Sequence, residues 1–248
     1  MRYRVVAIGA LVAAFAFAAC GGDEDEGGGD STLPQGSEPV ELDPAEFTTE
    51  IDNPYWPMAV GSRWVYHETD EEGSLQKVEV TVTDRTKQIA NGVEARVVRD
   101  VVSEGGEPVE VTDDWYAQDS EGNIWYLGED TAEYQRGKVK TRAGSFEAGV
   151  DGAQAGIAMP ADPRDGQTYR QEYYAGEAED RAEVLGTEEQ VEVPFGYFTG
   201  AVMTKDLVPL EPKVNEYKLY APDVGPVLTL KTSGGGGREE LITYEPGS

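Results

Sequence analysis

From Trp64 to Tyr244, segment after segment of the sequence alternates between apolar and polar residues. In residues 77–83, for example, three valines alternate with lysine, glutamate and threonine. This period of two is typical of an antiparallel strand that buries one face and exposes the other. Turn sequences such as Asn91-Gly92 and Gly105-Gly106 separate the segments. The pattern therefore predicts an antiparallel meander, and it contains no amphipathic helix longer than about three turns.

The number of these segments limits the shapes that the sheet can take. Roughly a dozen short strands with close turns are expected. A sheet of that size curls or closes, because open edges invite pairing with other chains. We therefore predict a mainly β fold, a single antiparallel meander forming a strongly curved sheet, half-barrel or open barrel with few or no long helices. The proline-rich lead at 51–62 or the irregular stretch 144–166 is expected to lie across its mouth.

The N-terminus carries a targeting signal. Arg2 and Arg4 precede an apolar run at residues 5–19, and Cys20, the only cysteine, follows it. At about 1.5 Å per residue the run spans roughly 22 Å, less than the roughly 30 Å hydrocarbon core of a bilayer. Cleavage is therefore favoured over a retained membrane-spanning helix.

The end of this signal, Phe17-Ala18-Ala19-Cys20, resembles that of bacterial lipoproteins, although a leucine is more usual where Phe17 stands. The resemblance implies removal of residues 1–19 and acylation of Cys20, which becomes the mature N-terminus. Two or more acyl chains anchor a protein stably. We therefore expect an extracytoplasmic lipoprotein, in the periplasm or at the cell surface, attached to the membrane through Cys20.

Composition divides the mature chain into two parts. Residues 20–45 are rich in Gly, Asp, Glu, Ser and Pro, which predicts a disordered acidic linker after the lipidated cysteine. Residues 46–248 contain the four tryptophans and are expected to form one β domain. With Cys20 committed to lipid the chain has no internal disulfide, so an apolar core must stabilise this domain.

The charge balance restricts the partners. The formal net charge is −28, and it becomes more negative when Arg2 and Arg4 leave with the signal. Nucleic acid and anionic headgroups are repelled by such a field, so neither is an expected partner. A basic protein partner, a divalent cation or a wall polycation is compatible with it, and so is acidity that serves solubility alone. We expect a monomer.

Residues for nucleophilic or metal catalysis are scarce. His67 is the only histidine, and no Gly-x-Ser-x-Gly sequence occurs. Zinc, copper and haem sites need several His or Cys ligands, so no metal or cofactor is predicted. Paired carboxylates leave a calcium site or a glycan-active enzyme as alternatives. The acidic clusters are Asp113-Asp114, Glu129-Asp130 with Glu133, and Glu177 with Glu179-Asp180.

Several strand and turn motifs carry a resemblance to a known family. They are Val193-Pro194-Phe195-Gly196-Tyr197-Phe198, Tyr220-Ala221-Pro222-Asp223-Val224-Gly225-Pro226-Val227, Glu240-Leu241, Asp52-Asn53-Pro54-Tyr55-Trp56-Pro57 and Gly122-Asn123-Ile124-Trp125-Tyr126. These motifs resemble those of uncharacterised bacterial envelope lipoproteins, whose sheets are similar to the half-barrel of lipoprotein carriers and acceptors of the LolA/LolB type. A leucine is more usual where Pro226 stands. The similarity covers most of residues 51–244, and it implies a fold rather than a chemistry.

These observations favour a lipid-anchored, non-enzymatic binding protein that holds an apolar ligand or a partner protein on its curved sheet. Large aromatic side chains are the natural contacts for such a ligand. The main alternative is an acidic structural or interaction module of the envelope, and the third is the carboxylate-dependent enzyme. The candidate ligand-binding residues are Trp56, Trp64, Trp115, Trp125 and Tyr126.

Overall fold

The computed structural model describes residues 33–69, 73–210, 212, 214–233 and 236–248. The predicted signal, the lipid site at Cys20 and residues 21–32 of the predicted linker lie outside these ranges. Residues 33–248 form one compact unit. Its described residues are mostly strand, with a single short 3-10 turn as helical structure.

The elements follow one another with short turns, as the alternating sequence predicts. Their bounds are η1 (Pro44–Glu46), β1 (Phe47–Thr48), β2 (Arg63–Thr69), β3 (Leu75–Gln88), β4 (Glu94–Glu104), β5 (Glu107–Asp119), β6 (Ile124–Gln135), β7 (Lys138–Thr141), β8 (Phe146–Glu147), β9 (Gln154–Met159), β10 (Thr168–Arg170), β11 (Glu172–Tyr173), β12 (Arg181–Val193), β13 (Gly196–Leu207), β14 (Asn215–Ala221), β15 (Gly225–Ser233) and β16 (Gly237–Glu245).

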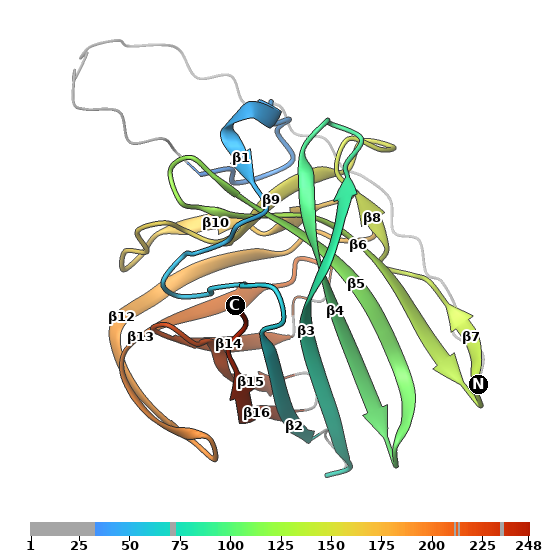
Figure 1. Cartoon of the computed structure of the whole chain (residues 1–248), viewed down its shortest axis with the longest axis vertical. Coiled ribbons are helices and arrows are strands. Elements are labelled where there is room, and N and C mark those ends of the chain that lie inside the picture. Colours follow the sequence, from blue (N-terminus) through green and yellow to red (C-terminus); the bar gives the residue numbers. More distant parts are fainter. Residues whose placement is uncertain (1–32, 70–72, 211, 213, 234–235) are drawn as a thin grey trace, which may run out of the picture. The chain divides into compact units, whose positions relative to one another are not determined.

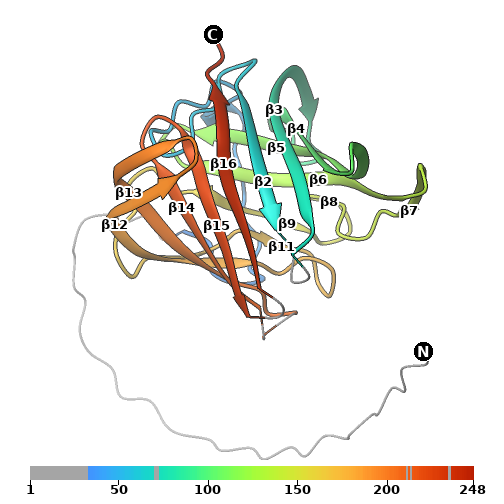
Figure 2. The ribbon, with the colours of Figure 1, turned by 90° about the horizontal axis from the view of Figure 1, so that it is seen from below.

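The strands form one antiparallel sheet in the order β10-β12-β13-β14-β15-β16-β2-β3-β4-β5-β6-β9-β11, with β1, β7 and β8 attached beside it. Pairing of β16 with β2, in which Leu241 lies opposite Tyr66, joins the last strand to the first long one. Figures 1 and 2 show that the sheet curls round on itself. It is nearly closed into a barrel with one open seam, so the predicted fold class is confirmed.

The seam lies where the two ends of the strand order meet, and the short strands β10 and β11 at those ends are neighbours in the chain. Arg170, only 1% exposed, donates from its guanidinium to Ala155 O of β9 and to the carbonyl oxygens of Gly36 and Glu38. Its backbone N–H donates to Pro34 O at 2.6 Å. The N-terminal stretch therefore straps one side of the seam.

This strap differs from the sequence prediction, which places residues 33–45 in a disordered linker. Leu33, Val40 and Leu42 pack against the core, and the compact unit begins at Leu33. The mean composition of the stretch is that of a linker, but three spaced apolar side chains are enough to hold it on the sheet. The linker prediction is therefore wrong for residues 33–45, and residues 20–32 lie outside the described ranges.

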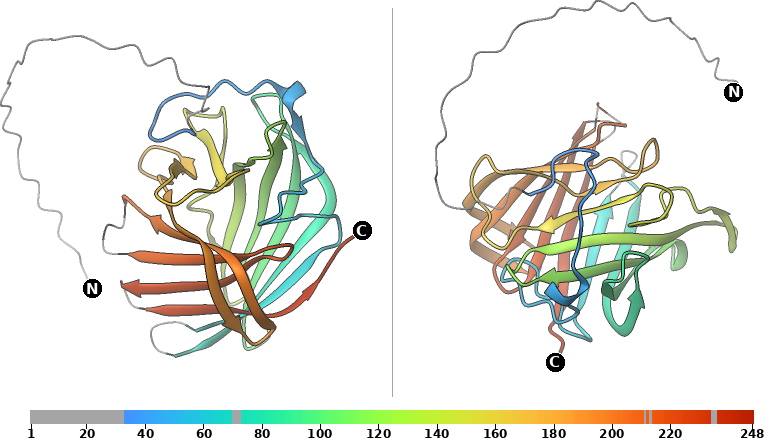
Figure 3. Two further views of the ribbon diagram at one scale, coloured as in Figure 1. Left: turned by 90° about the vertical axis from the view of Figure 1, so that its left-hand side faces the viewer. Right: turned by 90° about the horizontal axis from the view of Figure 1, so that it is seen from above.

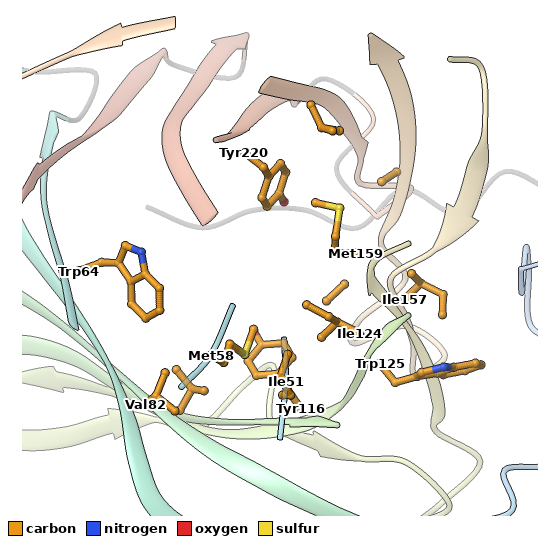
Figure 4. Packing of buried hydrophobic residues seen from close by; sticks show 14 of the residues in the cluster. Ile51, Met58, Trp64, Val82, Tyr116, Ile124, Trp125, Ile157, Met159 and Tyr220 are labelled. Atoms are coloured by element: carbon orange, nitrogen blue, oxygen red, sulfur yellow. The ribbon is translucent and has the colours of Figure 1, made fainter. Parts of the chain in front are cut away.

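The lead at residues 51–62 enters the curled sheet, as predicted, and covers one end of its interior (Figures 3 and 4). Ile51 and Met58 are buried, and Met58 N donates to Ile51 O at 2.9 Å. The amide of Asn53 donates to Gly122 O and Pro160 O, both at 3.0 Å, which fixes the lead to neighbouring turns. The proline pair flanking Tyr55-Trp56 keeps this stretch from forming a helix.

Part of the stretch 144–166 is more regular than expected, because residues 154–159 form β9 and pair with β6. Their side chains are small or aliphatic, and all but Gln154 are buried. A Cβ atom on Gly156 would lie 2.3 Å from Gln171 O, so the glycine allows the backbone at the seam to approach closely. The glycine-rich composition reflects tight packing here rather than an irregular loop.

Candidate functional site

A cavity of about 300 Å³ lies inside the curled sheet, next to the apolar core. A second cavity of about 220 Å³ adjoins it, because Asp100, Lys218 and Glu239 line both. Strands from both halves of the chain contribute side chains to the larger cavity, and the lead adds Trp56. The aromatic residues that line it are Trp56, Trp64, Tyr66, Tyr116, Tyr126 and Tyr220.

Four of these rings form a continuous wall. Trp56 lies between Tyr116 and Tyr220, with ring centroids 5.5 and 5.8 Å away, and Tyr116 stacks on Tyr126 at 5.1 Å. Figure 4 shows Trp64 and Tyr220 reaching inward from separate parts of the sheet. Such aromatic surfaces favour the apolar part of a ligand.

Hydrogen bonds hold part of the wall in place. Trp64 Nε1 donates to Val224 O at 2.8 Å, and the Tyr66 hydroxyl donates to Pro226 O at 3.0 Å. Both acceptors belong to the turn and strand that follow Tyr220. The polar atoms of these two side chains are therefore already satisfied.

Carboxylates line the same cavity. Asp100 of β4, Asp114 of β5, Glu172 of β11 and Glu239 of β16 all face it. The alternation of each strand explains their direction, because successive side chains point to opposite faces. The neighbours Arg99 and Asp113 meet on the other face, where Arg99 Nη1 lies 2.9 Å from Asp113 Oδ1.

Little positive charge offsets these acids. Lys218 is the cationic residue that lines the larger cavity, and its Nζ already lies 2.7 Å from Asp206 and 3.1 Å from Glu216. Among the described residues, no lysine or arginine forms an ion pair with the four cavity carboxylates named above. The wall is therefore apolar on its aromatic side and acidic beside it.

Burial shifts the titration of these acids. Burial, followed by the charges of nearby carboxylates such as Glu239, raises the pKa of Asp100 to about 8. Burial raises the pKa of Glu172 to about 8 and that of Glu239 to about 7. The pKa of Asp114 is also raised, mainly by burial and then by the charge of Glu129. Burial disfavours the charged form of a carboxyl group, which is the physical cause common to all four.

Three of the five predicted ligand-binding residues, Trp56, Trp64 and Tyr126, line the larger cavity. Trp115 does not, since it lies on the opposite face of β5 from Tyr116, with Lys87 Nζ 4.4 Å from its ring centroid. Trp125 also lies elsewhere, packed edge-on against Phe47 and donating from Nε1 to Asp119 at 2.7 Å.

The sequence analysis did not select Tyr66, Tyr116 and Tyr220 or the acids Asp100, Glu172 and Glu239. It named Asp114 and Asp180, which line the cavity, only as members of acidic clusters. The parity of the strand positions carries a signal for Tyr66 and Asp114. Tyr66 is two residues after Trp64, and Asp114 is two residues before Tyr116, so each pair shares a strand face. Large aromatic residues alone do not indicate which face of a strand they occupy.

The predicted acidic clusters are mostly divided between the two faces of the sheet. Asp130 pairs with Arg142, and Glu133 Oε2 lies 2.6 Å from Lys140 Nζ. Asp114 and Glu129 instead lie 2.8 and 2.9 Å from the Tyr126 hydroxyl, which donates its single hydrogen to one of them at a time. Within the ranges that the structure describes, no group of three or more His, Cys, Asp or Glu residues is arranged to hold a metal ion.

No protein-family model and no curated protein matches this chain. Three solved structures show weak similarity to this one. A Bacteroides fragilis protein assigned as exported, with a YmcC-like fold, has a TM-score of 0.45 at 16% identity and covers 79% of this chain and 100% of its own. A Parabacteroides distasonis protein assigned as a lipoprotein has a TM-score of 0.42 at 13% identity, covering 78% of this chain and 99% of its own.

The third is a β-barrel-like protein of the domain of unknown function DUF1849 from Brucella abortus, with a TM-score of 0.35 at 14% identity, covering 75% of this chain and 98% of its own. Similarities of this strength carry no argument about location, ligand or chemistry. The resemblance to the LolA/LolB type therefore stays a prediction. No helix in the described residues is long and apolar enough to cross a membrane.

Proposed function

We propose that this protein is a lipid-anchored, extracytoplasmic and non-enzymatic binding protein that holds a small molecule in the cavity inside its curled sheet. The observation that carries the proposal is the aromatic wall formed by Trp56, Tyr116, Tyr126 and Tyr220 around a space of about 300 Å³. Ligand sites of roughly 300–1,000 Å³ with apolar walls and a few polar groups are common. The anchoring part rests on residues 1–20, by the sequence argument alone.

The arrangement favours a small molecule over a partner protein as the occupant. The aromatic rings line an internal cavity rather than an exposed patch, and Trp64 is only 1% exposed. A protein partner would contact the outer face instead, where several acids are already paired, such as Asp113 with Arg85 and Arg99. An outer-face interaction remains the alternative, and high salt would weaken it.

One observation favours a second candidate, a carboxylate-dependent glycan-active enzyme. Asp114 and Glu129 share the Tyr126 hydroxyl, so two acids do converge. However, only Asp114 of the two lines the larger cavity, so a sugar there would not meet both members of this pair. Hydrolysis of wall glycan by the wild-type protein, lost in Asp114→Asn and in Glu129→Gln, would establish this activity.

Native mass spectrometry tests the binding proposal. The full-length chain carrying Cys20→Ser, which has no acylation site, is purified without detergent and examined for co-purified mass. We expect a bound small molecule in this protein, retained in Tyr197→Ala, whose ring is exposed on the surface, and lost in Trp56→Ala. An adduct that is retained in Trp56→Ala would count against the proposal. So would the absence of an adduct on the Cys20→Ser protein without any cavity substitution.

A further inference from the structure

We propose that the molecule held in this cavity is an organic cation, an amine or quaternary ammonium with an apolar body. This inference rests on the proposed function and specifies its ligand class. The cavity combines two kinds of wall, rings on one side and carboxylates beside them. A ligand that matches both must present an apolar surface and a positive charge.

The charge balance of the cavity is the first support. Asp100, Asp114 and Glu239 face it without an ion pair to any lysine or arginine in the described ranges. Lys218 does not neutralise them, because its ammonium group lies against Asp206 and Glu216. Buried carboxylates are normally paired or hydrogen-bonded, so a cation that entered this cavity would favour the ionised form of these acids.

An unsatisfied acceptor is the second and independent support. Oδ1 of Asp100 is shielded from solvent and has no hydrogen-bond partner among the residues that the structure describes. Asp100 lines both adjoining cavities, so its carboxyl group belongs to their wall, and rotation of that group about its Cβ–Cγ bond would bring this oxygen to a ligand. Native structures rarely leave such an atom unpaired. An ammonium N–H donor of the ligand would supply the missing hydrogen bond to Asp100.

The aromatic wall is the third support, because it is continuous with the acids. Asp114 accepts from the Tyr126 hydroxyl at 2.8 Å, and the Tyr126 ring stacks on Tyr116, which contacts Trp56. Aromatic faces attract ammonium groups through their quadrupole, and aromatic cages are a common way to bind them. The body of the ligand can thus lie on the rings while its charge meets the carboxylates.

Other ligand classes fit less well. A metal ion needs several ligands around one point, and no suitable group of three or more exists in the described ranges. A neutral apolar molecule would displace water from the carboxylates and return no hydrogen bond. An anion would find no free positive partner in the lining of the larger cavity, because Lys218 is already paired with Asp206 and Glu216.

Calorimetric titration with three matched probes tests the inference. They are 2-phenylethylamine, 2-phenylethanol and phenylacetate, which share a phenyl body and differ in charge. For the full-length Cys20→Ser protein at pH 7.5 we expect the amine to bind at least tenfold more tightly than the alcohol, and phenylacetate to bind more weakly than both.

Neighbouring residues on opposite strand faces supply the controls. Asp114→Asn and Glu239→Gln should each weaken amine binding by about tenfold while leaving alcohol binding unchanged. Asp113→Asn and Glu240→Gln alter the adjacent outward side chains, whose partners are Arg85 and Arg238, and should leave both affinities unchanged. Circular dichroism confirms folding of each variant.

The outcomes separate the two proposals. Equal affinity for amine and alcohol, reduced together by Trp56→Ala, would overturn the cation inference and leave small-molecule binding in place. Amine binding that falls in Asp113→Asn as much as in Asp114→Asn would indicate attraction to the acidic surface and would also overturn the inference. Absence of binding by all three probes would contradict both proposals.

Discussion

The guanidinium group of Arg170 donates two hydrogen bonds to the carbonyl oxygen of Ala155, from Nε at 3.1 Å and from Nη2 at 2.7 Å. Ala155 belongs to β9, the neighbour of the edge strand β11, and Arg170 belongs to the other edge strand, β10, so this contact crosses the seam at which the sheet fails to close. The third nitrogen, Nη1, donates to the strap at Glu38 O, at 2.8 Å. One buried side chain therefore replaces part of the missing strand pairing.

Arg170→Met should lower the free energy of unfolding by about 3 kcal/mol or more, because it leaves several buried carbonyl oxygens without a donor. Arg142→Met removes an exposed ion pair with Asp130 and should change stability by less than about 1 kcal/mol. Urea unfolding of both variants measures the difference. Equal effects would show that Arg170 does not hold the seam.

The strap itself can be tested by truncation. A chain that begins at residue 46 lacks the carbonyl oxygens of Pro34, Gly36 and Glu38, which accept from Arg170, and it lacks the apolar contacts of Leu33. It should unfold at lower urea concentration than a chain that begins at residue 33. Identical urea midpoints for the two chains would support the sequence prediction that residues 33–45 are a linker.

Gly156→Ala should destabilise the domain by about 1–3 kcal/mol, because the added Cβ would lie 2.3 Å from Gln171 O and the backbone must move. Gly196→Ala is the matched control, since its Cβ would have the Phe198 ring, 3.7 Å away, as its nearest neighbour. Thermal unfolding of the two proteins checks the prediction. A tolerated alanine at residue 156 would contradict the close approach of β9 to the seam.

Stability should fall as the pH rises from 5 to 8. Burial raises the pKa of Asp100 and Glu172 to about 8 and that of Glu129 and Glu239 to about 7. In the unfolded chain these groups titrate near roughly 4, so between those values the native state binds more protons. The free energy of unfolding therefore decreases with pH across that window and levels off above it.

Asp100→Asn should make the free energy of unfolding fall less steeply between pH 5 and 8. The variant should be more stable than the wild type at pH 8, on the order of 1–3 kcal/mol, and closer to it at pH 5. The carboxylates whose charges raise the pKa of Asp100 are Glu239 of β16, Glu110 of β5, Glu68 of β2 and Glu129 of β6.

Urea unfolding at both pH values measures this slope, with Asp130→Asn, on the exposed face, as control. Glu79 does not contribute to it, because hydrogen bonds from Arg63 and Lys77 lower its pKa to about 2. If the stability of Asp100→Asn falls with pH as steeply as that of the wild type, the raised pKa of Asp100 is contradicted.

The alternating pattern was sufficient to predict the fold class, because it reports directly which side of a strand is buried. Residues 77–83 show this well, since Val78 and Val82 are buried in the structure. The seam was not predictable in this way. It depends on a long-range contact between Arg170 and Ala155 and on the strap, and neither has a periodic signature in the sequence.

The candidate site was predictable in part, for a related reason. Trp64 and Tyr126 face the cavity, whereas Trp115 faces the other side, although all three are large aromatic strand residues. Choosing among them requires the parity of each strand relative to the core. The sequence did not single out the cavity carboxylates. The chain has 48 acidic residues, so a pair of acids indicates a site only when its burial is known.

The most direct test of the account is a crystal structure of the full-length Cys20→Ser protein soaked with 2-phenylethylamine. The account predicts the phenyl ring against Trp56 and Tyr220, and the ammonium group within hydrogen-bond distance of Asp100, Asp114 or Glu239. A cavity that stays empty while the amine occupies only the outer acidic face would contradict it.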